Sequence, residues 1–377
     1  MVPRQEKIIT GPRKPMQGVK PLLVVIYNQV FLPDILKVSV MALLIVAITL
    51  GNTVSLLVFL RARQFKTCQG YLKTSLALAD LAVGMVVVPY SVYREVNRLA
   101  YGVEEQDEPG PSGSLYTSLP CFILGPLYAW CTFVSITTIF LLSVERSVAV
   151  FKPLHKKAVI TKKRTAYLIA FSWILSLSLA VVPMIFNEQI TLEYSCCSKM
   201  CNYVLNAPSL NETDWNVMLL FPTFDFSLLS GTFAINFVTF AAIRQYCKVR
   251  KQMSLDAQNT ARKLSFSDIT AARTIGILTF AFSASFIPIA VFVVGNVLGY
   301  EWCEFSFYAF WILTLNSCWN VVIYSVRDQK FRQGVRELFT SEVLKSPSQR
   351  PTRALKTDSS SPPCVAVLKE IFRPEST

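Results

Sequence analysis

Two carboxylates of this chain lie inside long apolar stretches, where a charged group is costly. Asp80 and Asp225 both have mainly apolar neighbours along the chain. A carboxylate in such a stretch needs a partner, or it marks a functional site. We therefore treat both residues as candidate binding groups.

Histidine, the usual general base of a hydrolytic site, occurs once in the chain, as His155. An intramembrane protease would need a Ser nucleophile and a His base within its helices. His155 instead falls in a basic loop, and no His lies near the Cys196-Cys197-x-x-x-Cys201 run to complete a zinc site. We therefore expect neither enzyme activity nor a catalytic residue.

Ten cysteines are scattered along the chain, and five of them fall on the side that we assign to the oxidising exterior. A bridge from Cys121 to the long loop that holds Cys196, Cys197 and Cys201 would pin this loop over the helices. We favour Cys201 as its partner and keep Cys197 as the alternative, because sequence does not fix connectivity. The remaining loop pair could form a second, local bridge. Cys303 is the fifth cysteine of this side.

Long apolar stretches must position all of these groups. Hydrophobic residues make up 52% of the 377 and charged residues 16%, whereas soluble domains carry about a quarter charged residues. A span takes about 20 apolar residues, and lipid favours helices because every backbone group must be hydrogen-bonded. The predicted fold is an all-α membrane protein with a seven-transmembrane helix bundle. The spans are Val38–Leu60, Tyr71–Tyr93, Pro120–Val150, Tyr167–Phe186, Asn216–Ile243, Ala271–Val297 and Trp302–Val326.

Charge alternates between successive loops. Basic loops contain residues such as Arg61, Lys156 and Arg250, and acidic loops contain residues such as Glu104 and Glu188. The positive-inside rule places the basic loops in the cytoplasm, the N-terminus outside and the C-terminus inside. The alternating placement of the charges makes a nucleic-acid reading of the net charge of +13 unnecessary, so we expect no nucleic-acid partner.

The chain then divides into four regions in a multi-pass protein of the plasma membrane. Residues 1–37 form an extracellular tail, 38–326 the transmembrane domain, 327–340 an amphipathic eighth helix on the membrane lipid, and 341–377 a disordered cytoplasmic tail. A glycosylation sequon begins at Asn211, on the predicted outer side.

Short motifs at fixed places along these helices resemble those of the rhodopsin-like (class A) G-protein-coupled receptors. The likeness extends from Val38 to Phe339 and is nearest in pattern to the biogenic amine and trace amine branch. It implies a receptor that binds an extracellular ligand within the bundle and activates heterotrimeric G proteins. The motifs are Gly51-Asn52, Leu78-Ala79-Asp80, Cys121, Glu145-Arg146-Ser147, Pro153-Leu154, Trp173, Phe282, Pro288, Asn316-Ser317, Asn320 and Tyr324.

The resemblance gives Asp80 a role as an ion ligand. It groups Asp80 with Ser135, Asn316 and Asn320, whose oxygen atoms suit a hydrated, allosteric sodium ion. Beyond this ion, no metal and no cofactor are implied. The alternative is a protonated Asp80 that is hydrogen-bonded to the two Asn residues.

The resemblance also implies a switch at the cytoplasmic end of the third span. Glu145 and Asp268 would hold Arg146 in the resting state, and release of Arg146 would let it contact a G protein. Tyr324 belongs to the same switch, and Pro153-Leu154 would form a hydrophobic plug for the G protein. The alternative is a charge cluster at a membrane boundary. Receptor kinases and arrestin are expected partners of the Ser-rich tail.

Several positions that the family normally uses in its conformational switch carry a different residue in this chain. Val321 and Thr232 stand where Pro is usual, Phe286 stands for Trp, Phe240 for Tyr, and Ser147 for the Tyr after the Arg. Proline loosens a helix by removing a hydrogen bond. We therefore expect stiffer fifth and seventh spans and atypical switching.

The ligand site implied by the resemblance lies in the outer half of the bundle. Tyr128 occupies the position where amine receptors carry an Asp, but Asp225 of the fifth span would face the same pocket. We expect Asp225 to hold a cationic group, and nearby aromatic rings would add to the attraction. The alternatives are a structural Asp225 and a receptor for a peptide or a lipid. The other residues expected to line the site are Tyr128, Thr132, Phe286, Phe310 and Thr314.

Two further membrane classes are less well supported. A retinal-binding opsin would need a Lys within Trp302–Val326, and there is none. A transporter would usually show internal repeats and interrupted helices. A seven-helix channel subunit is the least excluded alternative to a receptor.

Overall fold

The protein is described from a computed structural model. It describes residues 19–101, 114–152, 156–186, 190–205, 212–253, 266–298, 300 and 302–339.

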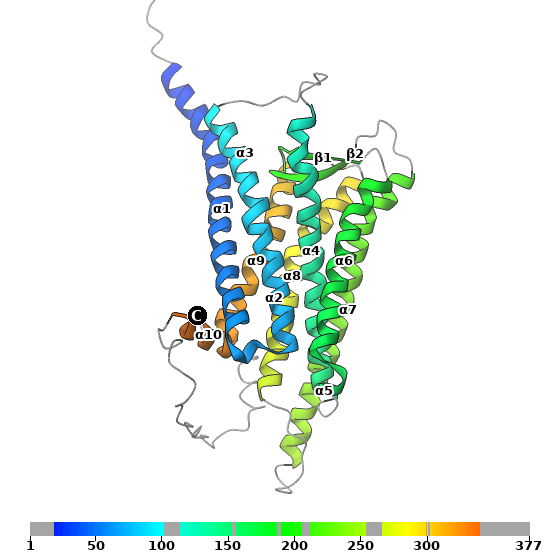
Figure 1. Ribbon diagram of the computed structural model, residues 1–377. Coiled ribbons are helices and arrows are strands. Elements are labelled where there is room, and N and C mark those ends of the chain that lie inside the picture. Colours follow the sequence, from blue (N-terminus) through cyan, green and yellow to red (C-terminus); the bar gives the residue numbers. More distant parts are fainter. Residues whose placement is uncertain are drawn as a thin grey trace, which may run out of the picture.

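Seven helical segments within these residues are long and apolar enough to cross a membrane, which confirms the predicted fold class. They lie side by side as a bundle (Figure 1), and the second of them is continuous through α2, η2 and α3. The helices are α1 (Val19–Arg61), η1 (Arg63–Phe65), α2 (Cys68–Ala82), the π-helical η2 (Val83–Val87), α3 (Val88–Tyr101), α4 (Ser114–Phe151), α5 (Lys156–Val159), α6 (Lys162–Phe186), α7 (Glu212–Met253), α8 (Phe266–Val297), α9 (Cys303–Arg327) and α10 (Gln329–Phe339).

The first helix begins earlier than predicted. α1 starts at Val19, and the apolar span within it is Leu32–Arg61, which begins before the predicted Val38. The division into an extracellular tail at 1–37 and a receptor domain from 38 stays a prediction. Hydropathy locates only the apolar part of a helix that can lie in lipid. The helix can extend beyond this part. Pro33 lies inside α1 without ending it.

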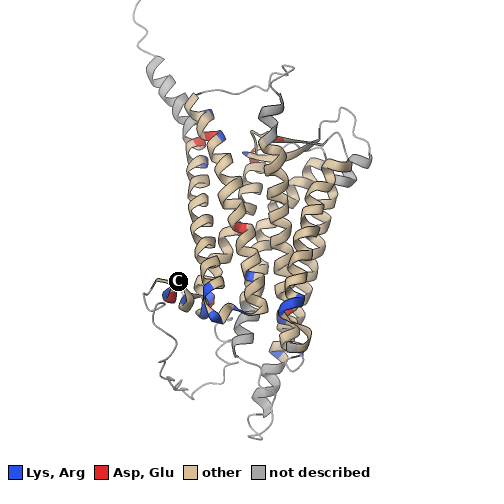
Figure 2. Cartoon of the chain, in the orientation of Figure 1, with Lys and Arg blue, Asp and Glu red and all other residues tan. Residues whose placement is uncertain are grey.

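Large apolar side chains cover much of the outer surface of the bundle. Phe237, Phe280 and Ile174 have exposed fractions of 74%, 68% and 66%. A water-soluble protein does not expose so many large apolar side chains over one surface. Figure 2 shows Lys and Arg gathered at the end of the bundle where α10 lies, as the positive-inside rule expects for a cytoplasmic end. We call this end the inner end and the opposite end the outer end.

A two-stranded hairpin, which the sequence analysis did not predict, follows α6. Strands β1 (Ile190–Ser195) and β2 (Met200–Leu205) pair antiparallel. Leu192 packs in a small cluster with Cys121, Leu124 and Cys201, so the hairpin is attached to the outer end of α4.

The predicted eighth helix is present as α10. Phe331 is buried in an apolar cluster with Phe59 and Tyr324, here called the inner core. Val335 and Leu338 are partly buried and pack against this core, and Phe339 is exposed. The Phe331 ring lies 5.7 Å from that of Phe59 and 5.9 Å from that of Tyr324. α10 therefore extends the inner core beneath α1 and α9.

Candidate functional site

Two disulfides hold the hairpin on the outer end of the bundle. Cys121 is joined to Cys201, the partner that we favoured. The second bridge joins Cys197 to Cys303 at the start of α9, so the expected local bridge within the loop is wrong. Hydropathy could not find this pair because 106 residues separate its members. Cys196 remains an exposed free thiol.

Asp80 lies at the centre of a group of polar side chains. The Asn320 amide donates to Asp80 Oδ2 at 2.7 Å, and the hydroxyls of Ser135 and Ser317 face the same carboxylate. Asn52 joins this group to α1 by donating to the carbonyl of Ser317 at 3.0 Å. Ser317 and Asn52 extend the set that the resemblance implied.

A small cavity beside Asp80 has room for about one water molecule. It brings together residues from two predicted sites, because Asp80 and Ser135 of the sodium site line it together with Tyr128 and Thr314 of the ligand site. The Tyr128 hydroxyl lies 3.0 Å from Thr314 Oγ1. Asp225, Phe286 and Phe310 are not among the residues that line this cavity. The lining residues are Asp80, Val83, Tyr128, Cys131, Thr132, Ser135, Phe282, Leu313, Thr314, Asn316 and Ser317.

Asp225 is buried in α7, and 4% of its surface is exposed. Its Oδ1 atom has no hydrogen-bond partner among the described residues. The preceding residue, Phe224, packs its ring edge-to-face on Phe133 of α4 at 5.5 Å. Asp225 is thus a buried carboxylate in an aromatic part of the bundle, where an unsatisfied polar atom is costly.

The two predicted phenylalanines of the ligand site occupy different places. Phe286 stacks on Phe282, a lining residue of the cavity, at 6.4 Å and meets Phe226 of α7 edge-to-face at 5.8 Å. The carbonyl of Phe310 accepts a hydrogen bond from Tyr128 at 3.3 Å. Phe310 therefore contacts Tyr128 of the expected site, whereas Phe286 contacts the wall of the cavity through Phe282.

Arg146 lies buried at the inner end of α4, with 6% of its surface exposed. Its Nε atom is 2.7 Å from Glu145 Oε2, so the predicted neighbour is in contact. Its guanidinium also donates to the side-chain oxygen of Gln69 in α2, a partner that sequence reasoning missed. Arg146 is therefore turned into the bundle.

A buried lysine near Arg146 was also missed. Lys73 of α2 pairs with Asp328 at 2.7 Å, and its ammonium lies 4.4 Å from the centre of the Tyr324 ring. Burial opposes the charge of Asp328, but the Lys73 ammonium and the backbone N–H groups of Phe331 and Lys330 hold the pKa of Asp328 below its usual value. A Lys within an apolar stretch was the signal in the sequence.

One of the altered positions, Thr232, has a local substitute for the missing proline. Thr232 donates its hydroxyl to the carbonyl of Leu228 at 2.7 Å, a bond that often bends a helix. α9 contains no proline. At Val321 it packs closely on α1, because a Cβ added to Gly51 of α1 would lie 3.1 Å from Val321 Cγ2. α7 retains Pro222, ten residues before Thr232, which the expectation of a stiffer helix had overlooked.

Some predicted residues lie outside the description. Pro153, Leu154 and Asn211 fall outside the described residues, and so does the side chain of Asp268 in α8. Their assigned roles remain predictions. Phe240 is described and is 43% exposed on α7.

Comparison with known proteins agrees with this arrangement. Residues 51–324 match the family described as 7 transmembrane receptor (rhodopsin family). The chain is 25% identical to trace amine-associated receptor 7d of Rattus norvegicus over 303 residues, which cover 79% of this chain and 80% of that receptor. Octopamine receptor beta-2R of Chilo suppressalis is 22% identical over 341 residues, with 80% and 78% covered. Adenosine receptor A2a of Homo sapiens is 25% identical over 299 residues, with 76% and 67% covered. The chain therefore belongs to the rhodopsin family of seven-transmembrane, G-protein-coupled receptors, a family of receptors and not of enzymes.

Proposed function

We propose that this receptor lies in the plasma membrane, binds a small amine through Asp225 and activates heterotrimeric G proteins through Arg146. The N-terminus would be outside and the C-terminus in the cytoplasm. Receptor kinases and arrestin would act on the tail beyond α10.

The burial of Asp225 carries the ligand part of the proposal. A buried carboxylate oxygen without a hydrogen-bond partner among the described residues is poorly compensated. An ammonium group would supply both the missing charge and the missing donor, and the neighbouring rings of Phe224 and Phe226 favour a cation. The relatives named for trace amines and octopamine are consistent with such a ligand.

The residues around Asp80 fit a sodium ion. Their carboxylate, hydroxyl and amide oxygens are the hard ligands that such an ion prefers, and the cavity has room for about one water molecule. Asp80, Ser135 and Asn316 would hold the ion beside Asn320. Its positive charge would stabilise the ionised form of Asp80.

The position of Arg146 supports a resting state. Its contacts with Glu145 and Gln69 keep the guanidinium buried, so coupling to a G protein requires that these contacts open. Asp268 would add a further restraint from α8. Lys73 and Tyr324 lie at the same inner end of the bundle, so they would move when the contacts of Arg146 open.

A paired set of ligands tests the proposal. Cells that express the receptor are exposed to β-phenylethylamine, tyramine and octopamine, and to 2-phenylethanol, which replaces the ammonium of β-phenylethylamine with a hydroxyl. We expect at least one amine, but not the alcohol, to raise a G-protein signal. Asp225→Asn should shift the potency of this amine by about a hundredfold, because it leaves a buried cation without its counterion.

The control is Glu304→Gln, which removes an exposed carboxylate at the start of α9. It should leave amine potency unchanged at equal surface expression. Equal potency on the parent and Asp225→Asn would refute the role of Asp225, and a response to the alcohol equal to that of its amine would refute a cationic ligand.

A further inference from the structure

The turn between β1 and β2 points into the bundle instead of into solvent. Ser198, Lys199 and Met200 have exposed fractions of 0%, 6% and 1%. Loops normally run over the surface because their polar backbone needs water. Here Met200 belongs to the main apolar core of the helices, together with Tyr128 and Leu313.

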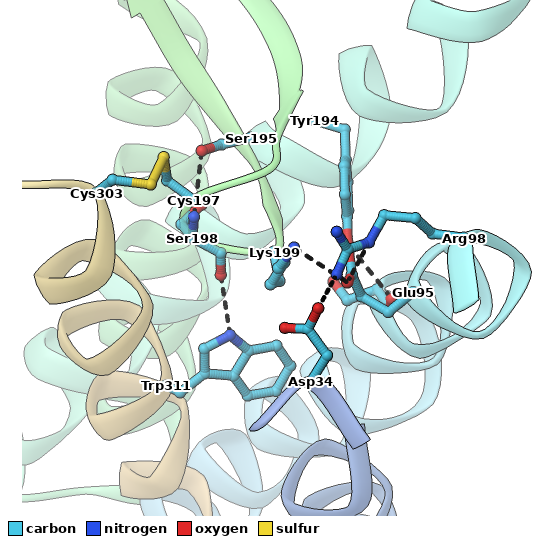
Figure 3. Close-up of polar contacts among 11 residues, drawn as sticks. Asp34, Glu95, Arg98, Tyr194, Ser195, Cys197, Ser198, Lys199, Cys303 and Trp311 are labelled. Atoms are coloured by element: carbon cyan, nitrogen blue, oxygen red, sulfur yellow. Dashed lines mark hydrogen bonds and ion pairs between the residues drawn. A yellow bond between two sulfur atoms is a disulfide. The ribbon is translucent and has the colours of Figure 1, made fainter. Parts of the chain in front are cut away.

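The buried backbone of this turn finds its partners within the protein (Figure 3). Trp311 of α9 donates its indole N–H to the Ser198 carbonyl at 2.9 Å. Within the turn, the Lys199 N–H donates to the Ser195 carbonyl at 2.8 Å, and the Ser198 N–H donates to Ser195 Oγ at 3.2 Å. The disulfide at Cys197 ties the turn to α9.

Lys199 carries a charge into this buried place, and Glu95 of α3 receives it. Lys199 Nζ lies 3.1 Å from Glu95 Oε2, the same oxygen that Arg98 approaches at 3.0 Å. Arg98 also pairs with Asp34 of α1 at 2.9 Å. Two cations and two carboxylates therefore balance one another across three segments.

Tyr194 completes the network from β1. Its hydroxyl donates to Glu95 Oε1 at 3.0 Å. Burial and the nearby Glu95 carboxylate raise the pKa of Tyr194 well above its usual value, so the hydroxyl stays a donor. Every charged group around Glu95 is thus satisfied by protein.

The backbone of Lys199 shows that this placement is specific. Its φ is 57°, in the left-handed region that residues with a Cβ rarely adopt. The ion pair and the hydrogen bonds described above hold Lys199 in this conformation.

We propose that residues 195–200 form a plug that closes the outer side of the cavity, and that the Lys199–Glu95 ion pair is its latch. The plug shares the apolar core with Tyr128 and Leu313, which line the cavity next to Asp80. A molecule that enters from outside must displace it. Opening exposes two charges that the closed form satisfies, so the latch sets how often the cavity opens. This inference concerns access and does not depend on the ligand proposed above.

The thiol of Cys131 offers a probe of opening, because it lines the cavity and is buried. Intact cells are treated with the membrane-impermeant reagent 2-(trimethylammonium)ethyl methanethiosulfonate. Modification of the Cys131 peptide is followed over time by mass spectrometry. All proteins carry Cys196→Ser, which removes the exposed thiol beside the Cys197 bridge.

We expect Lys199→Met and Glu95→Gln each to raise the modification rate of Cys131 about tenfold or more, because losing a buried charge partner shifts a local opening equilibrium by at least this factor. Lys199→Arg keeps the charge and should stay near the parent rate. Glu193→Gln, an exposed carboxylate of β1, is the matched control and should have no effect.

Unchanged rates in Lys199→Met and Glu95→Gln at normal surface expression would overturn the proposal. If these variants do not reach the surface, Trp311→Phe decides, because it removes only the indole donor to Ser198 and keeps an aromatic ring in place. A faster rate in this variant supports the plug, and an unchanged rate rejects it.

Discussion

The ion pair between Lys73 and Asp328 allows a charge to be removed without removing a helix cap. Asp328 Oδ2 pairs with Lys73, while its Oδ1 accepts the N–H groups of Lys330 at 3.0 Å and Phe331 at 3.2 Å and so caps α10. Asn caps a helix about as well as Asp. Asp328→Asn therefore keeps the cap and leaves the buried ammonium without its counterion.

The structure sets the size of the effect. Removing one partner of a buried pair costs about 3–5 kcal/mol, and the Lys73 side chain is 3% exposed. The Tyr324 ring offsets up to about 2 kcal/mol of this through its cation–π contact. We expect Asp328→Asn to lose roughly 1–3 kcal/mol of stability, and Asp328→Ala to lose about 1 kcal/mol more with the cap. Lys73→Met should cost less than Asp328→Asn, because Asp328 is 17% exposed and can reach water.

Thermal unfolding of the purified receptor in detergent tests this order. The expected midpoints fall from the parent through Lys73→Met and Asp328→Asn to Asp328→Ala. Because the pKa of Asp328 is lowered in the folded state, its stabilisation is present at neutral pH and is lost as the pH falls below its unfolded value of 3.8 and through its folded value. The gap between parent and Asp328→Asn should therefore narrow in acid. A midpoint of Asp328→Asn equal to that of the parent at pH 7 would refute the reasoning.

Two further predictions concern the packing of Gly125 and the ion site at Asp80. In Gly125→Ala, the added Cβ would lie 2.6 Å from Leu192 Cδ2, so stability should fall by about 1–3 kcal/mol. The same change should cost less in a Leu192→Ala background, which removes the clashing atom; an unchanged thermal midpoint in the single variant would contradict the packing. Replacing choline chloride with sodium chloride should raise the thermal midpoint of the parent but not of Asp80→Asn, because the carboxylate supplies the charge for the ion. An equal rise in both proteins would place sodium elsewhere.

Local sequence features predict part of this structure well. The seven spans follow from runs of apolar residues, and the contact of Glu145 with Arg146 joins neighbours in sequence. The hairpin also left a signal, because Ile190, Leu192 and Tyr194 alternate with polar residues as in a half-buried strand.

Local sequence patterns could not predict the contacts between distant segments. The pairs Lys199–Glu95 and Cys197–Cys303 join residues about a hundred positions apart, and their partners are fixed only when the helices pack. The π-helical turn after Asp80 was not predicted either; it packs closely on α1, where a Cβ at Gly84 would lie 2.5 Å from Ile48 Cγ2. Lys199, a base in an otherwise acidic outer loop, was the one local hint of the plug.

Signalling through Arg146 is tested most directly by nucleotide exchange on purified heterotrimeric G proteins with the receptor in lipid nanodiscs. The parent receptor, with the active amine where one is found, should accelerate GTPγS binding by at least one heterotrimer, and Arg146→Ala at equal receptor concentration should not. Exchange that is equally fast with Arg146→Ala, or that no heterotrimer shows with the parent, would contradict this account.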